Sequence, residues 1–149
     1  MEANDQNIAD YRRLIEIARD LASTLDLNTL LYRIVRVATE IADAEEASIL
    51  LYDQGAKQLH FQVATNMDPN MQGLDVPLEG SIAGWIATHG EPRVIQDVSQ
   101  EPAHFQNVDD ASGFQTRNIL GVPMRTHEKV IGVLEAVNKM AGDFTEDDL

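Results

Sequence analysis

Apolar positions in the first 42 residues recur at helical spacing. The polar triplet 26–28 interrupts them and contains two helix-capping residue types, Asp26 and Asn28. The pattern therefore predicts one helix before residue 26 and a second over 29–42. The apolar pattern before residue 26 has two interpretations. It is consistent with an ordinary amphipathic helix that packs on its own domain, and also with a signalling helix that forms a dimer. Its seam, with gaps that alternate between three and four, consists of Ile8, Tyr11, Ile15, Ala18, Ala22 and Leu25.

From residue 46 the apolar spacing becomes that of strands. A mostly apolar run over 47–52 predicts a buried strand, and the turn residues at 53–56 lead into a returning strand over 59–65. The segment 76–78 is expected at a sheet edge, because its proline cannot donate within a central strand. Two apolar stretches, 118–125 and 129–138, predict a second hairpin around 126–128.

Between the hairpins, the sequence predicts a helix that starts at Ser81 and ends at the C-cap glycine Gly90. A short strand over 92–98 and a polar loop over 99–113 follow. At the end, Thr145 precedes three acids, which is typical of a helix start. We therefore expect a fragment whose last helix continues into an output domain. The element order predicts an α+β fold with a central antiparallel sheet of about six strands.

Charge and composition narrow the function. The 149 residues include 25 acids and 11 bases, which gives a net charge of −14, and there is no cysteine. The electrostatic field of such a negative charge repels nucleic acid and anionic membranes, so we expect neither as a partner. The absence of thiols excludes disulfides and thiolate metal sites. No apolar run approaches the length of a membrane span and the N-terminus has no signal-peptide core, so we expect a cytoplasmic domain.

Three motifs in this order resemble a GAF domain from Leu25 onward. They are the helix opening at 80–85, the strand at 118–124 and the strand at 130–135. The resemblance implies a signalling or dimerisation helix over 1–25 and a GAF domain over 26–149 with a truncated C-terminal helix. It also implies terminal helices on one face of the sheet and a loop–helix lid over a pocket on the other. Such a domain is a regulatory sensor of a larger bacterial-type signalling protein, without metal or catalytic residues.

A narrower resemblance concerns the ligand. Asn138, Lys139, Phe144 and Asp148 resemble the NKxnFxxxDE signature of cyclic-nucleotide-binding GAF domains in phosphodiesterases and bacterial adenylyl cyclases, with Leu149 in place of the final acid. In that family the signature braces a lid, and 108–118 is similar to the segment that closes over the nucleotide. The resemblance thus implies cAMP or cGMP as regulatory ligand. No aromatic ring is present in 63–67, where the mammalian domains stack one on the base.

Physical reasoning adds roles for residues of that pocket. Free amides at Ile82 and Ala83, at the positive end of a helix, suit a phosphate. Glu135 interrupts an apolar strand, so it either faces solvent or has a partner such as a purine amine. Some of the candidates also have a purely structural interpretation. The serine at 48 is also consistent with a small core residue, and the polar residues of the lid are consistent with loop capping. The remaining candidate ligand contacts are Ser48, Thr65, Asp109, Ser112 and Thr116.

Two hypotheses of different kinds remain. In the first, a small molecule binds the pocket and shifts the terminal helices, which changes the output domain. In the second, the pocket is vestigial and the chain is a ligand-free module that forms a homodimer through its terminal helices and relays strain. An enzyme of the methionine-sulfoxide reductase kind is disfavoured, because that chemistry needs thiols.

Overall fold

The computed structural model describes residues 2–66, 74–100, 115–127 and 129–149, without the side chains of 2–4, 24 and 25. The chain divides into two compact units, residues 1–31 and residues 32–149. No helix in the described ranges is both long and apolar enough to cross a bilayer.

Residues 2–42 form one helix rather than two. Helix α1 (Glu2–Ala42) runs through Asp26 and Asn28 without interruption, so the break predicted at 26–28 is wrong. The helix contains no glycine or proline, and Asp or Asn inside a helix costs at most about 0.7 kcal/mol relative to alanine. A capping side chain is needed only where a helix begins, and here none begins.

The unit over 1–31 exposes large apolar side chains along its helix. Their exposed fractions lie between 48% and 67%. Such side chains follow the predicted seam and its flank, which is unusual for a helix that faces only water. The residues are Ile8, Tyr11, Leu14, Ile15, Ile17 and Leu21.

The unit over 32–149 contains one six-stranded sheet of order β3-β2-β1-β6-β5-β4. All neighbouring strands are antiparallel, which confirms the predicted class and sheet. The strand expected over 92–98 is shorter than predicted, because a 3₁₀ turn, η2 (Val98–Gln100), follows it. The strands are β1 (Ala44–Asp53), β2 (Gln58–Ala64), β3 (Asp75–Pro77), β4 (Arg93–Ile95), β5 (Ile119–Thr126) and β6 (Lys129–Lys139).

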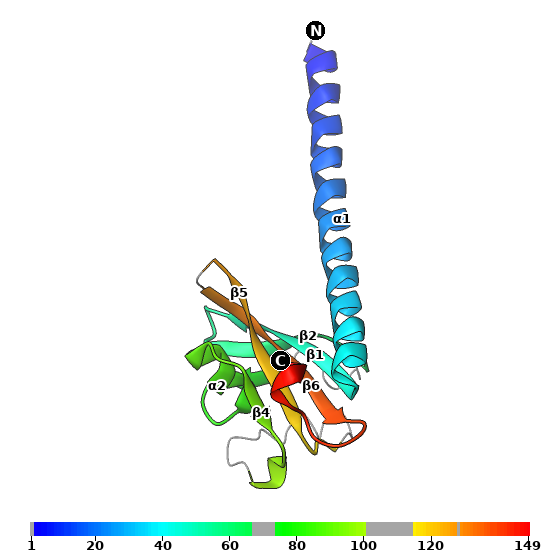
Figure 1. The fold of residues 1–149 in the computed structure, drawn as a ribbon. Helices are drawn as coiled ribbons and strands as arrows, with labels where there is room; N and C mark the ends of the chain where they lie inside the picture. The colour runs from blue at the N-terminus through cyan, green and yellow to red at the C-terminus, as the bar shows by residue number, and fades with distance from the viewer. Residues whose placement is uncertain (1, 67–73, 101–114, 128) are drawn as a thin grey trace. The chain divides into compact units, whose positions relative to one another are not determined.

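Each face of the sheet has its own apolar cluster, and Figure 1 shows the helices and strands that carry them. Helix α2 (Ile82–His89) covers one face, where Ile82, Ala83 and Ile86 pack with Leu50 and Val133. We call this the α2 face. The opposite face carries the end of α1 and the segment before the C-terminus, with a cluster that contains Ala42, Leu120, Ala136 and Phe144. The predicted placement of the two terminal segments on one face is therefore confirmed.

The capping predictions are confirmed at α2, and the C-terminal element is shorter than expected. Ser81 is the N-cap of α2, and Gly90 ends it in the left-handed conformation with φ of 65°. Near the C-terminus, the expected helix start is a 3₁₀ turn, η3 (Glu146–Asp148). The amide of Thr145 donates to Asp148 Oδ2 at 2.8 Å, so the acid closes the turn as a capping residue.

Candidate functional site

The N-terminus of α2 belongs to the apolar cluster of the α2 face, and its cap is formed by Ser81. Ser81 Oγ accepts from the amide of Gly84 at 2.9 Å and donates to the carbonyl of Pro77 at 2.5 Å. The first helical bond runs from Trp85 N to Ser81 O at 3.0 Å. No hydrogen bond is found for the amides of Ile82 and Ala83 within the part of the chain that the structure describes. These two donors lie at the positive end of the helix and suit an anionic group.

Close backbone packing fixes the position of that helix end. A Cβ at Gly84 would lie 2.1 Å from the carbonyl oxygen of Leu78, and a Cβ at Gly121 would lie 2.4 Å from Ile86 Cδ1. The two glycines therefore let α2 approach both the segment before it and strand β5.

Polar residues lie on the α2 face in one cross-strand row. Ser48 of β1 is opposite Glu135 of β6, and Glu135 is opposite Gly121 of β5. Strand alternation places Glu135 on the same face as Val133 and Val137, which pack in the cluster with α2. Of the two alternatives for Glu135, the structure supports the one with a partner, since the side chain is half-buried and has a polar contact.

Thr65 is engaged with the first strand. Its hydroxyl accepts from the amide of Ala47 at 3.1 Å and makes a short hydrogen bond to Glu46 Oε2. Glu46 lies opposite Val137, so its half-buried side chain is also on the α2 face. Sequence reasoning missed Glu46, although alternation from Ser48 would have found it.

The remaining candidate contacts belong to the segment before β5. Thr116 is half-buried and has a polar partner. Asp109 and Ser112, together with most of the candidate lid at 108–118, lie outside the described residues. The roles proposed for all three remain predictions.

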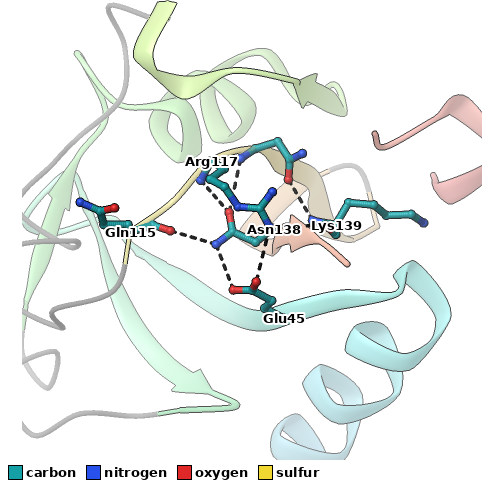
Figure 2. A network of polar contacts seen from close by, with 6 residues as sticks. Glu45, Gln115, Arg117, Asn138 and Lys139 are labelled. Atoms are coloured by element: carbon teal, nitrogen blue, oxygen red, sulfur yellow. Dashed lines mark hydrogen bonds and ion pairs between the residues drawn. The ribbon is translucent and has the colours of Figure 1, made fainter. Parts of the chain in front are cut away.

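Asn138 joins three segments that are far apart in the sequence (Figure 2). Its Oδ1 accepts from the amide of Arg117 at 2.6 Å, and its Nδ2 donates to Gln115 O at 2.9 Å and to Glu45 Oε2 at 3.2 Å. The side chain is 2% exposed, and its φ of 60° places the residue in the left-handed region, which Asn tolerates better than most residues. Strand β6, the start of β1 and the segment before β5 are thus held together by one amide.

Lys139 links the two ends of the second unit. Its Nζ donates to the carbonyl of Ala42 at 2.7 Å and to Asp148 Oδ1 at 3.0 Å, so two residues of the NKxnFxxxDE-like signature are paired with each other. The ammonium also lies 5.7 Å from the ring centroid of Phe144. Hydrogen bonds from the Thr145 amide and from Lys139 hold the pKa of Asp148 below its usual range.

An aromatic and cationic cluster lies at the other end of α2. The rings of Trp85 and His89 stack with centroids 4.2 Å apart, and the guanidinium of Arg93 lies 4.7 Å from the Trp85 ring. Trp85 itself packs against the core of the α2 face. Within the described ranges, no cluster of three or more potential metal ligands is present.

A family model and a curated protein match the sequence of this chain. The family model of the GAF domain matches residues 26–149. A dual 3′,5′-cyclic-AMP and -GMP phosphodiesterase 11A of Takifugu rubripes is 30% identical over 146 residues. That alignment covers 90% of this chain but 16% of the relative, so most of the relative has no counterpart here.

Solved structures agree on the fold. The GAF domain of a phosphoenolpyruvate-protein phosphotransferase from Coxiella burnetii aligns with a TM-score of 0.71 at 18% identity, over 90% of this chain and 82% of that one. A free methionine-R-sulfoxide reductase from Neisseria meningitidis aligns with a TM-score of 0.67 at 21% identity, over 81% and 68%. The family model and the sheet topology agree, and the chain belongs to the GAF domain family of regulatory sensing domains.

Proposed function

We propose that this domain senses a cyclic nucleotide, cAMP or cGMP, on the α2 face of its sheet. The observation that carries the proposal is the pair of amides at Ile82 and Ala83, which have no hydrogen bond among the described residues and lie at the positive end of α2. On a chain of net charge −14, a phosphate needs such a local cluster of donors. The similarity to a phosphodiesterase named for both cyclic nucleotides supports the same ligand class.

Lys139 and Asn138 provide a route from the site to the output domain of a longer protein. The Lys139 ammonium donates to the last carbonyl of α1, and Asn138 binds the backbone of the segment before β5. A ligand that moves this segment changes the geometry at the end of α1. The role that we propose is regulatory, and the chain contains no cysteine for thiol-based reduction.

The test is isothermal titration of the intact chain with cAMP and cGMP. Ala83→Pro removes one amide, and proline is tolerated in the first turn of a helix. Ala83→Gly keeps the amide and serves as the matched control. Loss of a hydrogen bond to a charged group costs about 1.5–3 kcal/mol, so the proline variant should bind at least about tenfold more weakly. Absence of heat and of a thermal shift at millimolar cAMP and cGMP would refute the proposal.

The exposed apolar seam of α1 supports a second candidate, a homodimer formed through this helix. Ile8, Tyr11 and Ile15 are 52%, 67% and 53% exposed, at the alternating spacing of a coiled coil. Light scattering of the intact chain should give the mass of a dimer, which Ile15→Asp converts to a monomer. Arg13→Asp, on the opposite side of the helix, is the control. A monomeric mass for the unmodified chain at high micromolar concentration would contradict the dimer.

A further inference from the structure

Two carboxylates lie beside a buried hydroxyl on the α2 face. Ser48 is directly opposite Glu135, and Glu46 precedes Ser48 by two residues on the same face of β1. Glu46 and Glu135 are therefore diagonal neighbours across β1 and β6, a separation of roughly 7–8 Å between such positions. Neither carboxylate is fully exposed, so solvent screens the electrostatic interactions of both only in part.

The Ser48 hydroxyl indicates that this part of the α2 face is accessible to a ligand. Ser48 is 9% exposed, and its side chain has no hydrogen-bond partner among the described residues. However, every fully buried side-chain nitrogen or oxygen in the described part of the chain has a hydrogen-bond partner. The small exposed fraction of Ser48 therefore includes its hydroxyl oxygen, and a buried hydroxyl that opens to accessible space suits a polar group of a ligand.

Thr65 holds the Glu46 carboxylate in place. The Thr65 hydroxyl donates to Glu46 Oε2 and accepts from the amide of Ala47, while the Thr65 amide donates to Ala47 O at 2.9 Å. These bonds lock the hydroxyl against the end of β1. The second oxygen of Glu46 has no hydrogen bond in the described part of the chain. The carboxylate is thus oriented in advance and keeps one acceptor for a ligand.

The chemistry of this group selects among bases. An ionised carboxylate only accepts hydrogen bonds, so it favours a ligand that presents neighbouring N–H donors. Guanine offers N1–H and N2–H on adjacent atoms, whereas adenine places the N6 donor next to the N1 acceptor, which a carboxylate repels. Building on the proposed function, we infer that Glu46 is a specificity-determining residue that makes this domain prefer cGMP to cAMP.

Titration calorimetry of the intact chain tests the inference. The unmodified protein should bind cGMP at least about tenfold more tightly than cAMP, as one charge-assisted contact implies. Glu46→Gln should bring that ratio close to one, because the amide supplies both a donor and an acceptor. Asp75→Asn removes a carboxylate from the exposed edge strand β3 and should leave the ratio unchanged. Thr65→Val keeps the branched shape but frees the Glu46 side chain, so it should reduce the ratio in part.

The outcomes separate this inference from the proposed function. If both nucleotides bind with equal affinity, or if Glu46→Gln keeps the preference while its thermal melt is native-like, the inference is wrong and the sensing role stands. If neither nucleotide binds, the sensing role fails, and guanosine and arginine replace them as phosphate-free probes with adjacent N–H donors. Heat from either probe that Glu46→Gln abolishes supports the role of Glu46. No heat from any probe at millimolar concentration overturns it.

Discussion

Asn138 gives the sharpest test of how the second unit is held together. Asn138→Ala removes the acceptor of the part-buried hydrogen bond from the Arg117 amide and the donor to Gln115 O, and it leaves alanine at a φ of 60°. A backbone donor left unsatisfied costs about 1–3 kcal/mol, and the left-handed conformation adds roughly 1–2 kcal/mol for a residue with a Cβ. Together these terms predict a loss of about 3 kcal/mol in the free energy of unfolding.

A glycine variant separates the two terms. Asn138→Gly loses the same hydrogen bonds but relieves the backbone strain, so it should be more stable than Asn138→Ala by about 1 kcal/mol. In an ordinary strand the order is reversed, since glycine is the less stable residue there. Asn138→Asp keeps the acceptors but places a carboxylate oxygen near Glu45 and Gln115 O, so it should be destabilised at neutral pH.

Urea denaturation of the intact variants, followed by circular dichroism at a constant m-value, measures these differences. A loss below about 1 kcal/mol for Asn138→Ala would show that the Asn138 side chain does not stabilise the fold, since one backbone N–H left without an acceptor already costs that much. An alanine variant more stable than the glycine variant would refute the argument from φ.

Three further predictions concern the cap, the close packing and the C-terminal ion pair. Ser81→Ala removes the N-cap of α2 and should lower the free energy of unfolding by about 1 kcal/mol in urea titrations. Gly84→Ala places a methyl group against the Leu78 carbonyl and should cost about 1–3 kcal/mol, so an unchanged melting temperature would exclude this contact. Because the folded pKa of Asp148 is lowered, its charge stabilises the fold above its unfolded pKa, near 3.9. That stabilisation is lost as pH falls through the folded value, so the difference between calorimetric melts of Lys139→Met and the unmodified chain should narrow below about pH 4, and the hydrogen bond from Lys139 to the Ala42 carbonyl accounts for the difference that remains.

Local patterns predicted the sheet and the caps because their causes lie within a few residues. Alternation and turn residues place the hairpins, and Ser81 and Gly90 mark the ends of α2 through bonds three or four residues away. The missed continuity of α1 has a local cause as well. Asp26 and Asn28 were interpreted as caps, although nothing in the triplet prevents a helix from passing through.

The candidate site was harder to predict, because its residues meet only across the sheet. Asn138 was recognised from its motif, but its partners Glu45 and Gln115 are 93 and 23 residues away. Alternation along β1 puts Glu46 on the same face as Ser48, but the register that sets Ser48 opposite Glu135 follows from strand pairing and not from spacing along the chain. Contacts of this kind become visible only when the pairing of the strands is known.

The position of Trp85 has a practical consequence. It is the sole indole of the chain, and it lies in α2 between the core of the α2 face and two groups that perturb its excited state, the His89 ring and the Arg93 guanidinium. A small rotation of α2 changes the distance between the Trp85 ring and the Arg93 guanidinium of β4, and the colour and intensity of the emission change with it. The protein therefore carries a built-in optical probe with which binding at the proposed site can be tested without a dye or a label.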